Sequence, residues 1–239
     1  MRPVSKTTCP IESGFPKKYK PHSIAKTDLE INLDNYCSYC EVYSSDLEVE
    51  HVISRHQDDT LTNSWDNFLL ACGRCNGRDN KSNKNVDTTQ IHFPHLNNTM
   101  LSFIYAEGGF VKVNPSLTDE SFIHANNLMD LVGLDKIPGN PKYPQLNLND
   151  TRWKHRRLAW ESATDILSEY LINNLSAKQV VDFAIQRGFF SVWFSVFIDH
   201  PLIKEILITR FKGTCEECFD VGNNFNLINR NVGNLTDPI

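Results

Sequence analysis

The sequence predicts an α+β fold: a small strand-strand-helix unit, held by four cysteines around a metal ion, precedes a mainly α-helical C-terminal region. Three observations support this fold class. Two Cys-x-x-Cys pairs, Cys37/Cys40 and Cys72/Cys75, bracket one short stretch of chain. Residues inside that stretch alternate between apolar and polar, as in a half-buried strand. Residues 150–239 instead repeat apolar side chains at helical spacing.

The composition is that of an ordinary globular protein. Of 239 residues, 40% are hydrophobic and 22% are charged, which provides a core and excludes global disorder. The first residues lack the apolar stretch of a secretory signal, so we expect a cytoplasmic protein that does not enter a membrane. Because thiols stay reduced in that compartment, the seven cysteines favour metal binding or burial over disulfides.

We expect four segments along the chain. Residues 1–36 form a polar extension that packs on the metal-bound unit or on a partner, and residues 37–95 form that unit. Residues 96–149 hold a hairpin, a short helix and a proline-rich linker, and residues 150–239 form a helical domain.

Local patterns predict the individual elements. The alternation over residues 47–53 predicts a strand, and the proline-free stretch 73–84 is compatible with a helix that turns Asn76 and Asn80 to one side. Gly108-Gly109 predicts a tight hairpin over residues 103–113, because glycine tolerates positive φ.

Further signals follow in the second half of the chain. A short helix is expected over residues 122–132, and the prolines of residues 137–150 mark a boundary. Ser176 and Gln179 form the pattern of a capping box at the start of a later helix.

The paired cysteines can supply the four sulfur ligands of a tetrahedral, structural zinc site. To do so, Cys37, Cys40, Cys72 and Cys75 must come together, which folds the intervening chain back on itself. Four buried free thiols are the alternative. Cys215 and Cys218 lack a second pair nearby in the sequence, so we expect them to be buried thiols.

Side chains between and beside the pairs fit phosphodiester hydrolysis, which needs a base, a cation and fixed geometry. His51 can serve as the base because imidazole is largely neutral near pH 7; a hydrogen-bonded core histidine is the alternative. Glu50 and Asn76 offer the hard oxygen atoms that Mg²⁺ or Mn²⁺ prefers, and Asn80 is a second candidate to Asn76. The Asn67 amide can bond to backbone as donor and acceptor, which would pin the loop that carries the base.

The net charge of −5 argues against a protein that binds nucleic acid unaided, because phosphate binding draws its affinity from lysine and arginine. Either basic residues gather at the site or another subunit holds the nucleic acid. The candidates for phosphate contact are Arg55, Arg74, Arg78 and Lys81. A solvated charged face is the alternative interpretation of these residues.

Glu50-His51, Trp65-x-Asn67 and Cys72-x-x-Cys75-Asn76 together resemble the HNH, or ββα-metal, endonuclease motif in its four-cysteine zinc form. The resemblance implies that His51 is the general base, that Glu50 and Asn76 hold a catalytic Mg²⁺ or Mn²⁺, and that Asn67 is structural. The sequence departs from the motif at two positions: many members have Asp before the histidine, and others have His in the place of Asn76. Adjacent strand residues also point to opposite faces, which makes Glu50 the weaker ligand.

The string Tyr36-Cys-Ser-Tyr-Cys-Glu41 and the opening Met-Arg-Pro-Val are similar to the nuclease subunit of Septu anti-phage systems, including those attached to retrons. This resemblance implies a partner ATPase of the SMC/ABC type and, in retron-associated systems, a reverse transcriptase with its RNA and DNA. DNA is the expected substrate. Cleavage of RNA such as tRNA, or a binding module that keeps its zinc without catalysis, are the alternatives.

Overall fold

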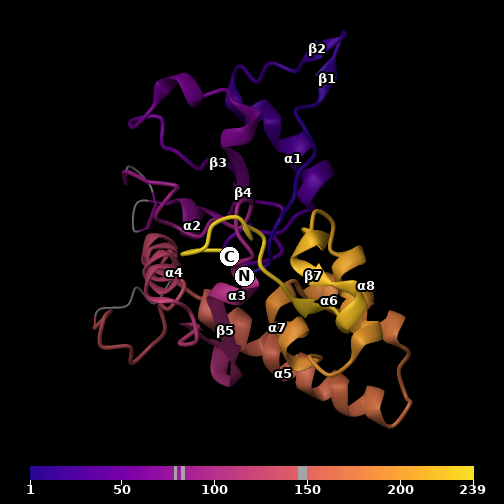
Figure 1. Ribbon diagram of the computed structural model, residues 1–239. Helices are drawn as coiled ribbons and strands as arrows, with labels where there is room; N and C mark the ends of the chain where they lie inside the picture. The colour runs from indigo at the N-terminus through magenta and orange to yellow at the C-terminus, as the bar shows by residue number, and fades with distance from the viewer. Residues whose placement is uncertain (78–79, 82–83, 145–149) are drawn as a thin grey trace.

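The computed structural model describes residues 1–77, 80–81, 84–144 and 150–239 (Figure 1). Small two-stranded antiparallel sheets and helices build two hydrophobic cores. One core is formed mainly by residues before 135, and the other lies among the C-terminal helices. Both ends of the chain lie in the middle of the molecule, between these two parts (Figure 1). The predicted α+β class is confirmed.

The N-terminal extension forms a projecting hairpin and a helix. The hairpin, β1 (Ile11–Glu12) and β2 (Phe15–Pro16), stands out at one end of the molecule (Figure 1). Helix α1 (Ala25–Leu33) buries Leu29 and Leu33 on one face and leaves Ile31 exposed. The extension contacts the central unit, where the Trp65 indole N–H donates to the Thr7 carbonyl at 2.8 Å. The four-segment division itself stays a prediction.

The central unit is a strand pair followed by one helical turn. Strand β3 (Glu48–His51) runs antiparallel to β4 (Phe68–Ala71), with His51 opposite Phe68. The four residues of β4 are all buried.

Helix α2 (Gly73–Asn76) is shorter than the predicted helix over residues 73–84. A Cβ atom at Gly77 would lie 2.4 Å from the Gly73 carbonyl oxygen, and Gly77 is extended with a ψ of 175°. The chain therefore leaves the helix at Gly77, and Asn80 does not follow Asn76 by one helical turn. The expectation that both asparagines face one way from a single helix was wrong.

The middle of the chain follows the sequence prediction closely. After α3 (Thr99–Ser102), strands β5 (Phe103–Ala106) and β6 (Phe110–Val113) form the predicted hairpin. Gly109 has a φ of 78° there, and a Cβ atom on it would lie 2.4 Å from the Trp153 carbonyl oxygen. Glycine is required at this position for its positive φ and for the close packing of helix α5 (Arg152–Leu171). Helix α4 (Asp119–Val132) begins at a Thr118 cap, three residues before the predicted start.

The C-terminal region is mainly helical, as predicted. It comprises α5 (Arg152–Leu171), α6 (Ala177–Arg187), α7 (Phe190–Val196), α8 (Pro201–Arg210) and the short pair β7 (Phe219–Asp220) and β8 (Asn226–Leu227). The Ser176/Gln179 capping box is present at α6. Among the described residues, the helices are all too short or too polar to cross a lipid bilayer.

Candidate active site and metal centre

The thiols of the two Cys-x-x-Cys pairs meet beside the start of α2. The sulfur atoms of Cys37, Cys40, Cys72 and Cys75 lie within 4.8 Å of one another, and those of Cys40 and Cys72 are 3.6 Å apart. Four sulfur atoms at about 2.3 Å from one tetrahedral centre would be spaced by about 3.8 Å, so the cluster has the size of a metal site. No cysteine is in a disulfide. Because the thiols share hydrogen bonds, the pKa of Cys72 is lowered and that of Cys40 is raised.

A buried arginine from the C-terminal region faces this cluster. The Arg152 Nη1 atom lies 3.2 Å from the Cys75 Sγ, and the guanidinium also donates to the Val132 carbonyl at 2.8 Å. Its ion pair with Asp150 is 2.7 Å long. A metal bound by four thiolates carries excess negative charge, so a cation at this distance favours the deprotonated cysteines. The donor set and its surroundings both fit a bound metal ion.

The imidazole of His51 is held in one orientation. Its Nε2 lies 2.9 Å from the Thr62 carbonyl oxygen. A carbonyl oxygen only accepts, so Nε2 must carry the ring proton, and in the neutral ring Nδ1 carries the lone pair. Burial lowers the pKa of His51, although the Thr62 hydrogen bond acts in the opposite direction. His51 is therefore a neutral imidazole at pH 7 with one nitrogen able to accept a proton.

Asn67 fastens the loop that follows His51. Its Oδ1 accepts from the Ile53 N–H at 2.8 Å, while its Nδ2 donates to the Ile53 carbonyl at 2.9 Å and to the Leu61 carbonyl at 3.3 Å. The side chain is 6% exposed. These bonds tie the two ends of the segment between β3 and Thr62 together, which is the contact pattern that the amide chemistry predicts.

Glu50 lies on the opposite side of β3 from His51. Its side chain is fully buried, forms an ion pair with Lys81, and accepts a hydrogen bond from the Tyr39 hydroxyl at 3.0 Å. Alternation along the strand explains this arrangement, because neighbouring residues face opposite sides. Among the described residues, Glu50 does not line the cleft that Asn76 lines, so the expectation that the two residues hold one cation together stays a prediction.

Glu48, two residues before Glu50 on β3, is the carboxylate that lines the cleft with His51. The Asn76 Nδ2 donates to the Glu48 Oε2 at 2.9 Å, and both residues line the same cleft as His51. Glu48 begins β3 opposite Ala71, just before α2, so its carboxylate reaches the end of that helix. Glu48 was not predicted, because the resemblance places the carboxylate directly beside the histidine. The Glu-x-Glu-His string offered both carboxylates, and only the strand geometry distinguishes them.

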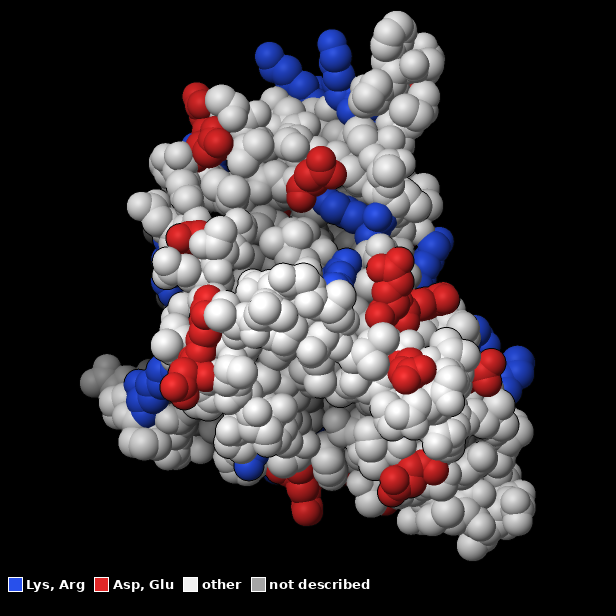
Figure 2. Space-filling view, viewed as in Figure 1, with Lys and Arg blue, Asp and Glu red and all other residues white. Residues whose placement is uncertain are grey.

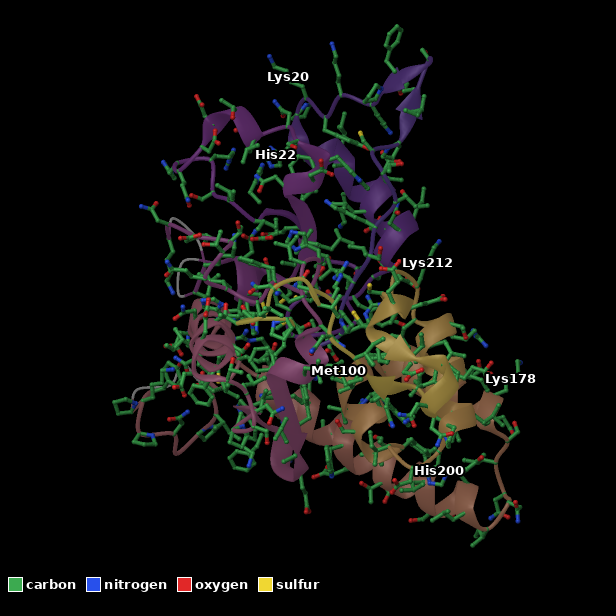
Figure 3. All side chains as sticks on the ribbon, viewed as in Figure 1. Lys20, His22, Met100, Lys178, His200 and Lys212 are labelled. Atoms are coloured by element: carbon green, nitrogen blue, oxygen red, sulfur yellow. The ribbon has the colours of Figure 1, made fainter. Side chains whose placement is uncertain are left out.

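The cleft has a volume of about 620 Å³ and is bordered by two parts of the chain. The central unit contributes His51, Glu48 and Asn76, and the N-terminal extension contributes His22, Ser23 and Lys26. His56 and Arg55 also line it, and both are exposed. Figure 3 labels His22 close to Lys20, at the end of the molecule that carries the β1–β2 hairpin.

The remaining predicted residues lie in different surroundings. Asn80 is buried, and its Oδ1 accepts from Lys136 at 2.7 Å, so its amide is used in packing. Lys81 lines the cleft but is 3% exposed, and its Nζ donates to the Val52 carbonyl at 2.8 Å, so its contact with phosphate stays a prediction. Arg74 is exposed but does not line the cleft, and Arg78 lies outside the described residues. Cys215 and Cys218 are buried and join no metal-capable group in the part of the chain that the structure describes.

A second group of possible metal ligands was not predicted. His92 and His124 both contact the Asp237 carboxylate, at 2.8 and 2.6 Å, and the Ser121 hydroxyl donates to it at 2.6 Å. All three ligand residues are buried. The three residues are far apart in the sequence, so no spacing could reveal them. Hydrogen bonds already account for this group, and we interpret it as a clasp for the C-terminal segment.

Comparison with known proteins identifies one region of the chain. Residues 34–82 match the sequence model of the HNH endonuclease family. The match contains the four cysteines, His51, Asn67 and Asn76, and it ends before the hairpin of β5 and β6. Among curated proteins, no sequence matches the chain. The HNH match indicates a nuclease, a hydrolase that acts on nucleic acid.

Proposed function

We propose that this protein is a zinc-stabilised endonuclease that uses Mg²⁺ or Mn²⁺ to cleave DNA. One observation carries the proposal: His51 lines a cleft together with Glu48 and Asn76, while the Thr62 carbonyl fixes its ring tautomer. A base with its lone pair on a defined nitrogen, beside two hard oxygen ligands, is what metal-assisted hydrolysis requires. A binding module without catalysis has no need for this arrangement.

We infer two metal sites with different roles, a structural zinc site and a catalytic cation site. The four cysteines would hold the zinc, and the oxygens of Glu48 and Asn76 would hold the second cation, which when bound offsets the charge on the phosphate and the leaving oxygen. His51 Nδ1 accepts a proton from a water molecule. The water oxygen then bonds to phosphorus as the bond to the leaving oxygen breaks. Asn67 keeps the segment between β3 and Thr62 in place during this step.

We further propose that the chain works in the cytosol with an ATPase subunit of the SMC/ABC type in defence against phage, with or without a retron reverse transcriptase. The resemblance to Septu nuclease subunits supports this, and so does the net charge of −5. Figure 2 shows acidic and basic side chains interspersed, with basic ones at the end beside the β1–β2 hairpin. A chain with a net negative charge is suited to receive DNA from a partner.

The experiment compares wild type with His51→Ala on supercoiled plasmid in Mn²⁺, with His155→Ala as control. His155 is an exposed histidine on α5 that does not line the cleft. We expect His51→Ala to lose about 10²- to 10⁴-fold in rate, and His155→Ala to match wild type. A parallel series on structured RNA decides between DNA and RNA. Equal cleavage by His51→Ala and wild type would refute the assignment of the base.

DNA binding tests the partnership. At physiological salt the purified chain should bind duplex DNA weakly, and the complex with its ATPase should bind more tightly. Tight binding by the chain alone, with little dependence on salt, would remove the reason to propose a partner.

A further inference from the structure

A second imidazole stands beside His51, and it comes from outside the HNH match. His22 begins a short 3-10 turn, His22–Ile24, just before α1. The ring centroids of His22 and His51 are 4.7 Å apart, with an angle of 63° between the rings. Phe68 also packs edge-on against His51, at 5.3 Å. Residue 22 precedes the matched residues 34–82, so the N-terminal extension adds its own side chain to the candidate site.

The position of His22 is set by rigid neighbours. Tyr19 stacks on Trp65 at 5.6 Å and hydrogen-bonds to the Asp28 carboxylate at 3.0 Å. Ala25, directly after the turn, is fully buried. The backbone on both sides of His22 is thus attached to α1 and to Trp65, in the turn Trp65–Asn67 before β4.

The ring of His22 has hydrogen-bonding capacity that the protein does not use. Neither of its nitrogen atoms has a hydrogen-bond partner among the described residues, although the side chain is half-buried in the wall of the cleft. Burial, with the neighbouring His51 and Arg55, lowers the pKa of His22. A neutral imidazole offers one N–H donor and one acceptor. If His22 only packed against His51, an apolar side chain would be sufficient. Phenylalanine or leucine would provide it without the cost of removing a polar imidazole from water.

We propose that His22 is a substrate-binding catalytic residue whose ring N–H donates to a non-bridging oxygen of the phosphate that His51 attacks through water. This inference rests on the proposed nuclease function and adds a phosphate contact from the N-terminal extension. The nucleic acid strand then crosses the cleft between the His22–Ile24 turn and β3. Arg55, exposed at the rim of the same cleft, provides positive charge for the adjoining phosphates.

The test removes the ring nitrogen atoms of His22 and compares variants of different shape and hydrogen-bonding capacity. His22→Phe preserves the aromatic packing against His51, His22→Leu is a second variant without hydrogen-bonding groups, and His22→Gln restores a donor. His155→Phe is the matched control on α5. Cleavage of a fluorescent DNA oligonucleotide is measured at several substrate and Mn²⁺ concentrations, and zinc content and thermal unfolding are recorded for each variant.

We expect His22→Phe and His22→Leu to lose about ten- to a hundredfold in kcat/KM, because one hydrogen bond to a charged group is removed. His22→Gln should lose less than tenfold, and His155→Phe should match wild type. Zinc content and unfolding temperature should stay at wild-type values.

Three results would overturn the inference. His22→Phe could cleave as well as wild type, which would leave only a packing role. Excess Mn²⁺ could restore His22→Phe, which would make His22 a metal ligand. His22→Gln could be as inactive as His22→Phe at unchanged stability. In each case an inactive His51→Ala variant and an active wild type show that the proposed nuclease function still stands.

Discussion

Replacing Glu50 by glutamine should destabilise the fold, whereas replacing Glu48 by glutamine should disable the cleft. The Glu50 and Lys81 side chains are 0% and 3% exposed and form an ion pair on the side of β3 opposite to the His51 side chain. Glutamine keeps a hydrogen-bond acceptor for Tyr39, but it leaves the buried Lys81 ammonium without its counter-charge. The Glu48 carboxylate is exposed and, among the described residues, accepts a hydrogen bond from Asn76, so its replacement should remove the proposed metal ligand and little packing.

The size of the Glu50 effect follows from the burial. Removing one partner of a buried ion pair costs about 3 to 5 kcal/mol. Lys81 retains the carbonyls of His51 and Val52 as acceptors, so we expect the lower end, about 3 kcal/mol. In a chain of this length, such a loss lowers the unfolding temperature by about 6 to 12 °C. A double variant, Glu50→Gln with Lys81→Met, removes both charges and should recover part of the loss.

Urea unfolding and plasmid cleavage separate the two carboxylates. Glu50→Gln, assayed well below its unfolding temperature, should retain most of its cleavage rate. Glu48→Gln should unfold like wild type and require more Mn²⁺ for half-maximal rate. A Glu50→Gln protein with wild-type stability and no activity would show that Glu50 holds the catalytic cation, and the geometric reasoning would be wrong.

Three further predictions concern pH, zinc and the C-terminal clasp. Because burial lowers the pKa of His51, its base form persists on acidification, so the acid limb of the pH–rate profile should have its midpoint below 6.5, the unperturbed value; a midpoint above 6.5 contradicts this. Cys72→Ser should lose bound zinc by elemental analysis and unfold, because metal binding energy is folding energy at such sites; a zinc-free, stable variant would refute the structural role. Burial would raise the pKa of Asp237, but hydrogen bonds from Ser121 and His124 outweigh it and the net shift is downward. Asp237→Asn should therefore cost about 1 to 3 kcal/mol in urea unfolding with cleavage unchanged, and wild-type stability would show that the clasp contributes nothing.

Features fixed by local chemistry could be predicted from the sequence. The hairpin depends on Gly108 and Gly109, and the capping box on Ser176 and Gln179, so short strings were sufficient. The cysteine pairs also came together as their spacing indicated. The hydrogen bonds of Asn67 follow from the two-sided chemistry of an amide.

Features that depend on the three-dimensional path could not be predicted in this way. Glu48 and Glu50 are both acidic residues of one strand, and only the pairing of β3 with β4 shows which carboxylate faces the buried side. Lys81 has the sequence surroundings of a surface cation, and only its ion pair with Glu50 shows that it is buried. His22 reaches the cleft through the packing of the N-terminal extension, and Asp237 meets His92 across most of the chain. No sequence period encodes such contacts.

Anomalous diffraction from crystals soaked in Mn²⁺ tests the central claim most directly. The account predicts a peak in the cleft, bonded to the carboxylate of Glu48 and the amide oxygen of Asn76, with the His51 imidazole facing it and Nε2 still on the Thr62 carbonyl. A cleft without such a peak, with manganese bound instead by His92, His124 and Asp237, would contradict it.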